Sequence, residues 1–313
     1  MDGLDLGILK ILLVNNGVPP GIPVLRKSFR SIAKDLGVDQ GTVRTRMRRF
    51  QEQRVLRGWY LGVSPGLRGR DLGNAWLRVE EDSDKSRVVN ALLTSPDVER
   101  VCNYLGPRLS LLFLVEKGIG PGSSLGKLMP MAGPGVTLTR EGIIPVPDYE
   151  LKETDSSIIG SLGQDPWKPY SRVAEEVGIS TRTLARRISK LSEAGAIYML
   201  PDIDLKAIQG LIPIELGVEY DSPGSRAGVN RLIVSHIGPE LVFSDNSGPF
   251  GYFALAVPNL SRMDELARWV SQLEGVQGAR VDALQDVILN RSHYESWGMR
   301  MTGARRAEEI RLR

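Results

Sequence analysis

The feature that most constrains the fold of this chain is an internal repeat. Residues 29–58 can be laid over residues 170–199 at an offset of 141 without a gap. The apolar positions keep their character throughout, and an aromatic residue opens both copies. A repeat of this kind predicts that one local fold occurs twice. The identical pairs are Ala33 and Ala174, Gly37 and Gly178, Thr42 and Thr183, Arg46 and Arg187, and Glu52 and Glu193.

Each copy has the pattern of two helices around a tight turn. In the first copy the apolar residues recur at i, i+3, i+4 and i+7, which is typical of one helical face. Gly37 then marks a helix stop, and Asp39 is placed to cap the next helix. Gly178 and Ser180 take these roles in the second copy. The buried stripes are Phe29, Ile32, Ala33, Leu36, Val43, Met47 and Phe50, and then Tyr170, Val173, Ala174, Val177, Leu184, Ile188 and Leu191.

This pattern predicts a helix-turn-helix, whose second helix enters the major groove of DNA. A further helix is expected before each copy, over residues 4–15 and 154–162, which completes a three-helix unit. The first copy carries an insertion at 17–27 between its first two helices, which forms either a basic wing-like loop or a longer turn.

Charge is concentrated in the repeats. Residues 24–58 hold ten Lys and Arg against three Asp and Glu, and residues 168–199 hold six against three, so the rest of the chain is net acidic. Two basic patches on an acidic body are expected of a phosphate-binding surface. A solvated basic helix is the better explanation of one such patch taken alone, but it explains the recurrence less well.

The segment after each repeat predicts the strand and helix order βαββαβ, which is the ferredoxin-like unit. The fold class expected is therefore α+β, with two helix-turn-helix (winged-helix-like) domains alternating with two ferredoxin-like domains. In the first of these the second helix is short, over residues 124–129. The predicted domains are 1–62 and 148–202 for the helix-turn-helix units, 63–147 and 203–295 for the ferredoxin-like units, and 296–313 for an Arg-rich tail.

Composition argues against most catalytic chemistry. One cysteine, Cys102, excludes an internal disulfide, and two histidines leave little for a zinc site. We expect Cys102, His236 and His293 to be structural, the first two in the core. The Gly-rich stretch at 118–128 lacks the P-loop spacing because Pro121 stands where Gly is needed and Leu128 follows Lys127; a flexible loop is expected. No catalytic residue, metal or cofactor is expected, and the absence of long apolar runs favours a cytoplasmic protein without membrane contact. DNA binding by the helix-turn-helix units would place it at the prokaryotic nucleoid.

The chain resembles the Lrp/AsnC, or feast/famine, regulators. The resemblance lies in "LDLGILKIL" (4–12), "IAKDLGVDQGTVRTRMRRF" (32–50), "VAEEVGISTRTLARRISKLSEAGAI" (173–197), and the closing "GPFGYFALAV" and "LEGVQGARVDALQDVIL". It implies double-stranded DNA as partner, a small-molecule effector and homo-oligomers through the ferredoxin-like sheets. Family members usually have one copy per chain, so two unequal copies imply an intramolecular pseudo-dimer.

The helical phase predicts which residues face DNA. Gln40, Arg44 and Thr45 are placed to reach base edges, whereas Arg48 and Arg49 are placed to contact phosphates. Arg46 and Arg187 either contact phosphate or pair with Glu52 and Glu193. The full set of expected DNA-binding residues is Gln40, Thr42, Arg44, Thr45, Arg46, Arg48, Arg49, Thr181, Arg182, Ala185, Arg186, Arg187 and Lys190.

The expected effector residues are Gly248, Phe250 and Tyr252. Family members tend to have an acidic residue after the Gly-x-aromatic turn, where this chain has Gly251, so an amino-acid effector of the family type is not implied. Two other functions stay open. The first is an enzyme similar to the siroheme decarboxylases, which have a similar two-part architecture. The second is an architectural DNA-binding protein with little sequence preference, which would have the same basic helices.

Overall fold

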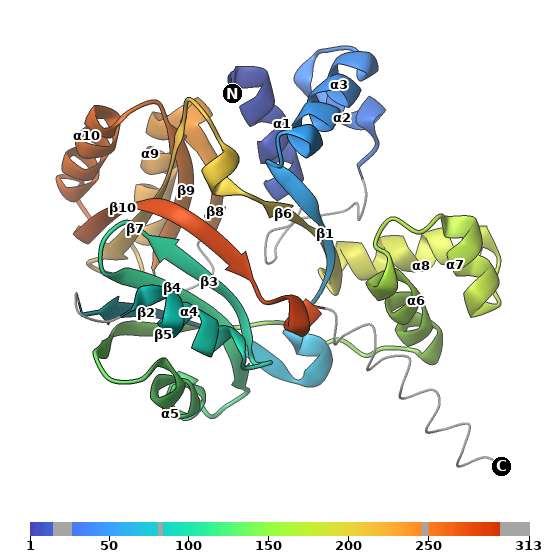
Figure 1. The fold of residues 1–313 in the computed structure, drawn as a ribbon, viewed down its shortest axis with the longest axis horizontal. Coiled ribbons are helices and arrows are strands. Elements are labelled where there is room, and N and C mark those ends of the chain that lie inside the picture. The colour runs from blue at the N-terminus through green and yellow to red at the C-terminus, as the bar shows by residue number, and fades with distance from the viewer. Residues whose placement is uncertain (15–26, 81–83, 246–249, 295–313) are drawn as a thin grey trace.

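The computed structural model describes residues 1–14, 27–80, 84–245 and 250–294 of the 313-residue chain. Two three-helix units and two βαββαβ units alternate along it, which confirms the predicted fold class (Figure 1). Most of the insertion at 17–27, the residue Gly248 and the tail from 296 lie outside the described residues.

The two helix-turn-helix units share their turn geometry. Gly37 and Gly178 both take a left-handed conformation, at φ 66° and 73°, which glycine adopts without steric cost. The Asp39 side chain accepts a hydrogen bond from Thr42 N–H, and Ser180 accepts one from Thr183 N–H, so both predicted caps are confirmed. The helices are α1 (Gly3–Val14), α2 (Phe29–Leu36), α3 (Gln40–Glu52), α6 (Glu153–Gln164), α7 (Tyr170–Val177) and α8 (Thr181–Glu193).

The first ferredoxin-like unit follows the predicted order, with one correction. The segment expected to be a flexible loop with a short helix at 124–129 forms a helix of 12 residues, which begins at Pro121. Proline is favoured in the first turn because its missing N–H has no partner there anyway. The elements are β2 (Arg70–Val79), α4 (Lys85–Leu93), β3 (Val98–Tyr104), β4 (Arg108–Glu116), α5 (Pro121–Ala132) and β5 (Val136–Ile144).

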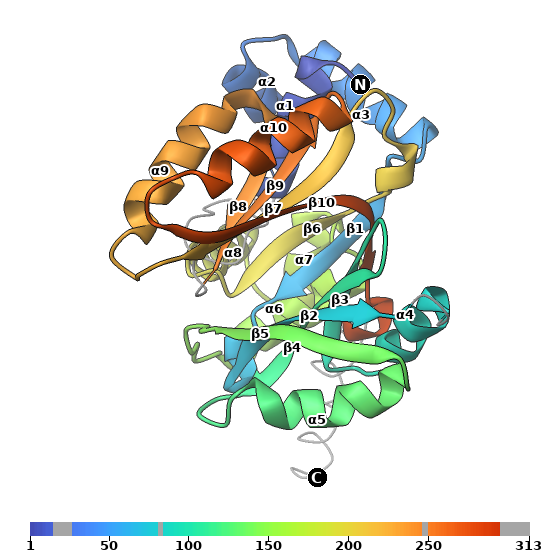
Figure 2. The same ribbon diagram turned by 90° about the vertical axis from the view of Figure 1, so that its left-hand side faces the viewer.

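The second ferredoxin-like unit also has the predicted order. Its two helices cover one face of its strands and bury a core of Ile, Leu, Val and Phe side chains (Figure 2). The elements are β7 (Ile212–Tyr220), α9 (Arg226–Ile237), the 3-10 turn η3 (Gly238–Glu240), β8 (Leu241–Asp245), β9 (Gly251–Val257), α10 (Leu260–Ser271) and β10 (Val276–Leu289).

The two ferredoxin-like units share one eight-stranded sheet in the order β5-β2-β4-β3-β10-β7-β9-β8. Strand β10 joins the halves, because Val276 to Ala283 pair with β7 whereas Leu284 to Leu289 pair with β3. The helices α4 and α5 pack on the first half and α9 and α10 on the second (Figure 2). The opposite face, here called the helix-free face, carries no helix of the ferredoxin-like units, although α1 of the first helix-turn-helix unit packs against it at β8.

A two-stranded ribbon links the helix-turn-helix units, and sequence analysis did not predict it. Strand β1 (Leu56–Val63) pairs antiparallel with β6 (Ile197–Ile203). Leu61 and Val63 pack in the core of the second unit, whereas Ile203 packs in the core of the first. Each strand therefore starts from its own unit and ends on the other. The 3-10 turns η1 (Pro65–Arg68) and η2 (Leu205–Ala207) follow the two strands.

The cysteine and histidines are mostly structural, as expected. Cys102 is buried, and the buried His293 ring meets the Pro96 carbonyl oxygen at 2.9 Å from Nδ1. The expected core position of His236 is wrong: this residue is exposed on α9, and its ring stacks on Trp269 with the ring centroids 3.8 Å apart.

Candidate nucleic-acid interface

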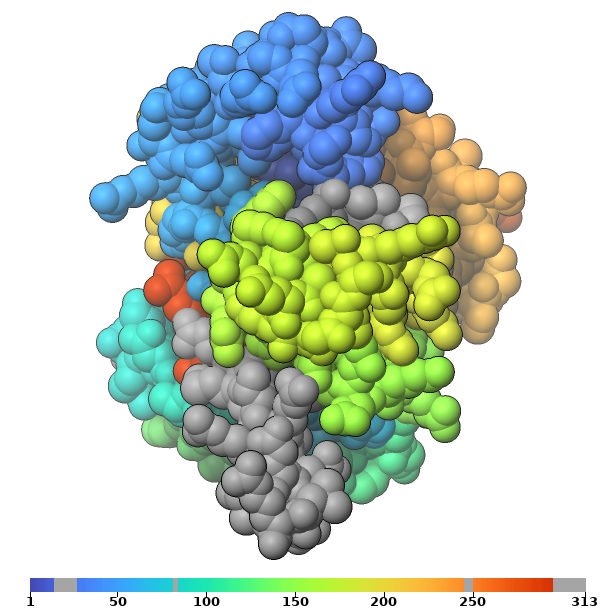
Figure 3. Space-filling model, turned by 90° about the vertical axis from the view of Figure 1, so that its right-hand side faces the viewer, coloured from blue at the N-terminus to red at the C-terminus, as the bar shows by residue number. Residues whose placement is uncertain are grey.

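The two helix-turn-helix units lie on the same face of the molecule. Figure 3 shows the first unit (blue) above the second (yellow-green), with both open to solvent on that side. Each second helix turns its apolar stripe inward, as predicted. The buried residues are Val43, Met47 and Phe50 in α3 and Leu184, Ile188 and Leu191 in α8.

Most of the residues expected to meet DNA are exposed on the outer sides of α3 and α8. They are Gln40, Arg44, Thr45 and Arg48 in the first unit, and Thr181, Arg182, Ala185, Arg186 and Lys190 in the second. Thr42 differs because it is half-buried and its hydroxyl donates a hydrogen bond to the capping carboxylate of Asp39. Its first role is therefore to support the cap.

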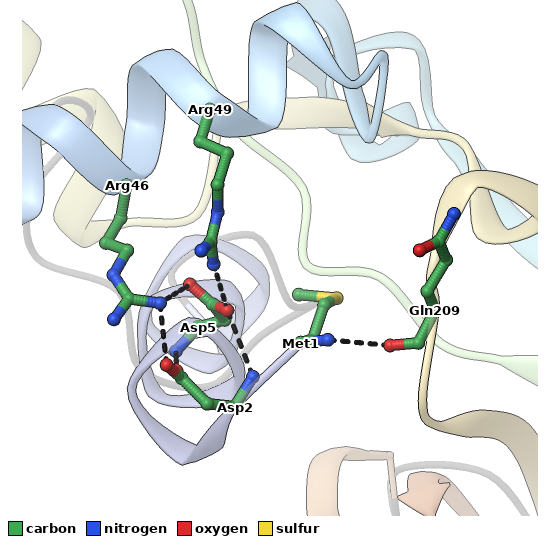
Figure 4. Close-up of polar contacts among 6 residues, drawn as sticks. All are labelled: Met1, Asp2, Asp5, Arg46, Arg49 and Gln209. Atoms are coloured by element: carbon green, nitrogen blue, oxygen red, sulfur yellow. Dashed lines mark hydrogen bonds and ion pairs between the residues drawn. The ribbon is translucent and has the colours of Figure 1, made fainter.

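Arg46 and Arg49 turn inward and hold the first unit together (Figure 4). Arg46 Nη1 lies 2.7 Å from Asp2 Oδ2 and 3.0 Å from Asp5 Oδ1, and Arg49 Nη2 pairs with Asp5 Oδ2. The Asp5 side chain is fully buried. The pairing of Arg46 with Glu52 that the sequence allowed is wrong, because the buried carboxylate in α1 takes the guanidinium instead.

The second unit repeats this contact. Arg187 Nη1 lies 2.8 Å from Asp155 Oδ1, and Asp155 is buried in the first turn of α6. Glu193, the other partner considered, accepts a hydrogen bond from Ser189 at 2.7 Å instead. The first helix of each unit, α1 or α6, is here called the leading helix. Each leading helix has an acidic residue in its first turn, Asp5 or Asp155, and this signal in the sequence was missed.

The second helix of each unit, α3 or α8, is here called the outer helix. The remaining cations of the two outer helices are available to a ligand. Within the described part of the chain, Arg44, Arg48, Arg182, Arg186 and Lys190 form no ion pair with a carboxylate. Exposed guanidinium groups can meet phosphates or donate two hydrogen bonds to guanine. The structure thus separates paired arginines, which belong to the scaffold, from unpaired ones on the open surface.

The expected effector residues lie on the helix-free side of the eight-stranded sheet. Phe250 meets Trp76 edge-on, with ring centroids 5.7 Å apart, and the Arg140 guanidinium lies 4.5 Å from the centre of the Phe250 ring. Phe250 and Tyr252 both line a small cavity between the two halves of the sheet. Among the residues that the structure describes, no three or more His, Cys, Asp or Glu side chains are grouped to hold a metal ion.

The ribbon and the sheet place the first unit against the second ferredoxin-like unit. Lys10 Nζ of α1 donates a hydrogen bond to the Pro239 carbonyl oxygen, and the backbone nitrogen of Met1 donates one to the Gln209 carbonyl oxygen at 2.7 Å (Figure 4). No helix in the described ranges is both long and apolar enough to cross a bilayer.

Comparison with known proteins identifies the relatives of the chain. Residues 151–192 match the AsnC-type helix-turn-helix domain. The HTH-type transcriptional regulator Ptr1 of Methanocaldococcus jannaschii is 38% identical over 129 residues, which cover 41% of this chain and 79% of that protein. An HTH-type transcriptional regulator of Pyrococcus abyssi is 24% identical over 147 residues, covering 44% of this chain and 94% of that protein.

A solved structure shares the fold over nearly the whole chain. The siroheme decarboxylase NirDL is similar with a TM-score of 0.50 and 15% identity, over 97% of this chain and 99% of that one. At this identity the likeness concerns the fold alone. Taken with the Ptr1 match and the AsnC-type domain, the two units described above show that the chain belongs to the Lrp/AsnC family.

Proposed function

We propose that the chain is a sequence-specific DNA-binding transcriptional regulator. The observation that carries the proposal is the placement of two helix-turn-helix units on one face, each with unpaired cations on its outer helix (Figure 3). Its relatives in Methanocaldococcus and Pyrococcus bear the name of transcriptional regulators, which supports the same function.

In this proposal the two outer helices read different base sequences. Gln40 and Arg44 of α3 correspond to Thr181 and Ala185 of α8 at the offset of 141, and all four are exposed. Gln and Arg donate to purine edges, whereas Thr and Ala contact the thymine methyl group or make weaker contacts. We therefore infer an asymmetric operator.

We assign the phosphate contacts to Arg48 and Lys190, and Arg186 to the groove beside Arg182. Arg49 and the pair Arg46 and Arg187 take a scaffold role, because carboxylates of the leading helices hold them. Thr42 supports its cap, and Thr45 and Arg182 remain proposed contacts beside the base readers.

We also propose that the chain is an intramolecular pseudo-dimer made of two tandem copies of the family unit. The first copy would comprise residues 1–147 and the second 148–295. The shared strand β10 and the β1–β6 ribbon support this, because both join the copies by backbone hydrogen bonds. Further assembly through the ferredoxin-like sheets and control by a small molecule are part of the same proposal.

Gel-shift titration with a selected genomic fragment and with scrambled DNA tests the proposal. Arg44→Ala should reduce the preference for the selected fragment by about 1–3 kcal/mol, while Arg48→Ala should weaken both DNAs alike. Arg268 is an exposed arginine on α10 away from the interface. Arg268→Ala is therefore the matched control and should change neither the affinity for DNA nor the preference for the selected fragment. The proposal that these helices recognise DNA would be refuted if Arg44→Ala, Arg48→Ala and the wild type bound the selected fragment with equal affinity. If the wild type shows no preference between the two DNAs, the chain is an architectural DNA-binding protein instead.

An enzymatic function is the second candidate, because the siroheme decarboxylase NirDL shares this fold over nearly the whole chain. Against it, the two histidines of the chain lie away from the helix-free face: His236 is exposed on α9 and His293 contacts the Pro96 carbonyl oxygen. Absorbance spectra of the purified protein with added siroheme would show a shifted Soret band if this second function is correct and an unshifted band if it is wrong.

A further inference from the structure

A second, larger cavity lies beside the small one on the helix-free face, and its walls are almost wholly apolar. Its volume is about 170 Å³. Leu9 and Leu13 of α1 form one wall, Ile203 of β6 forms another, and Val287 and Leu289 of β10 lie on the sheet side. The cavity thus lies between the first helix-turn-helix unit and the second half of the sheet.

One charged side chain faces this apolar space. Arg100 of β3 lines both the large cavity and the small one. Its side chain forms no hydrogen bond and no ion pair with any residue in the described parts of the chain, whereas its backbone belongs to the strand pairs of β3 with β4 and β10. A guanidinium with five donors and no acceptor is costly in such surroundings, and the cost is removed when an anion binds.

The other charges near Arg100 are already balanced. Arg140 pairs with Glu219, and Arg280 Nε lies 2.5 Å from Asp282 Oδ2. The buried Glu215 accepts a hydrogen bond from the Tyr104 hydroxyl and has Arg280 at 3.8 Å. Glu99, the neighbour of Arg100 in the chain, accepts a hydrogen bond from the Tyr294 hydroxyl at 2.9 Å. Arg100 is therefore the one cation of this group whose side chain has no hydrogen-bond or ion-pair partner among the described residues. Nearby Glu99 interacts with it electrostatically without forming an ion pair.

The small cavity offers a second unpartnered donor. Trp76 is 7% exposed and lines this cavity, and its Nε1 has no hydrogen-bond partner among the described residues. Buried polar atoms in folded proteins nearly always have a partner, so an unpaired donor beside an unpaired cation indicates an absent acceptor. Both donors favour the same chemistry, which is an anionic oxygen group.

We propose that these adjoining cavities bind a small apolar carboxylate, with its carboxylate on Arg100 and its body in the apolar cavity. An apolar cavity of about 150 Å³ holds one benzene molecule, so this one fits a single aromatic ring or a short branched chain. The lining side chains of the large cavity offer no acceptor for an ammonium group, and the unpartnered acceptor of the small cavity, Asn74 Oδ1, is an uncharged amide, which disfavours a zwitterionic amino acid. The ligand would touch α1, whose Asp5 holds Arg46 and Arg49 of the outer helix α3. Binding would in this way alter DNA affinity, a consequence that rests on the proposed function.

Calorimetric titration of the full chain tests the binding, with phenylacetate as the probe. Phenylacetamide is the uncharged comparator and phenylglycine the comparator with an added ammonium. Phenylacetate should bind at one site per chain and about 10- to 100-fold more tightly than either, because hydrogen bonds to a charged group are lost or an ammonium is left unpaired. These comparisons use the wild-type protein, so they do not depend on the folding of a variant.

Two variants test the two parts of the site. Arg100→Met keeps a long side chain without the charge and should weaken phenylacetate by about 10- to 100-fold. Ala254→Phe fills the apolar cavity from β9 and should abolish binding while Arg100 is kept. Arg231→Met, an exposed arginine on α9, is the matched control and should bind as the wild type does. Thermal denaturation of each variant verifies that it is folded.

The results separate this inference from the proposed function. Absent phenylacetate binding, or equal affinity for phenylacetate and phenylacetamide, would overturn the carboxylate site even if DNA binding were intact. Tighter binding of phenylglycine than of phenylacetate would overturn the ligand class. One-site binding that depends on Arg100 and on the open cavity would support the site even if the protein bound no DNA.

Discussion

At the scale of single residues, the arginines of each outer helix divide into two groups by their partners. Those facing the leading helix are held by buried carboxylates, and those facing solvent are unpaired. Sequence analysis found the helices and their solvent-facing residues, because helical phase is a local property. The partners Asp5 and Asp155 lie 32 to 44 positions from their arginines in the sequence, and a contact over this separation leaves no local pattern.

Asp5→Ala tests the scaffold role of the paired arginines. The change leaves Arg46 and Arg49 without their buried partner, and we expect the free energy of unfolding to fall by about 2–4 kcal/mol. The lower limit of this estimate is smaller than the loss expected for a fully buried ion pair, because both guanidinium groups are partly exposed to solvent. Urea denaturation measures it. Asp148→Ala, which removes the exposed partner of Lys117, is the control and should cost less than about 1 kcal/mol; an equal loss in both variants would contradict the scaffold role.

Asp2 predicts a pH dependence. The backbone N–H of Asp5 and the Arg46 guanidinium lower the pKa of Asp2 from 3.8 to about 2. A pKa that is lowered in the folded state stabilises the protein at pH values above the pKa of the unfolded state. This stabilisation is lost as the pH falls through the pKa of the folded state. The stability difference between wild type and Asp2→Asn should therefore be largest near neutral pH and should fade between about pH 4 and pH 2. A difference that is constant over this window in chemical denaturation would contradict the assignment.

At the scale of elements, the sequence was most informative where structure is local. The helix periods, the glycine stops and the caps at Asp39 and Ser180 all appear where predicted. The pairing of β1 with β6 was not predictable, because it depends on two segments about 140 residues apart meeting in space. The Gly and Pro residues around α5 predict a shorter helix, because both residue types commonly end helices, whereas Pro121 begins this one.

The ribbon itself can be tested at a glycine. Gly62 of β1 lies opposite Tyr198 of β6, and a Cβ at this position would overlap the tyrosine ring. Gly62→Ala should therefore lower the free energy of unfolding by about 1–3 kcal/mol and weaken DNA binding, because the two units would shift relative to each other. Gly58→Ala in the same strand meets no atom within 4 Å and is the matched control. Thermal denaturation and gel-shift titration of both variants check this, and equal effects would show that the ribbon does not need the glycine.

At the scale of the whole molecule, the continuous sheet makes one body of two ferredoxin-like units. Strand β10 is hydrogen-bonded to both halves, so neither half can lose its strands without exposing an edge of the other. Sequence analysis predicted the two units but not their shared strand, because β10 was assigned to one unit by its position in the chain.

Cooperative unfolding follows from this shared strand. Leu111 lies in the core of the first half and Leu216 in the core of the second, and both are almost fully buried. Each substitution by Ala should cost about 2–5 kcal/mol and shift the same calorimetric transition of the sheet. Two separate transitions, each moved by one variant only, would show that the halves unfold independently.

The central claim is that both outer helices read one DNA site, and hydroxyl-radical footprinting at physiological salt with competitor DNA tests it most directly. On the preferred genomic site we predict two unequal protected half-sites on one face of the duplex, separated by about 10 base pairs or a multiple of this. Replacing Arg44 and Arg48 by Ala should remove protection of one half-site, and replacing Arg182 and Arg186 should remove the other. Equal protection of a strictly symmetric site, or a footprint unchanged by both double variants, would contradict the account.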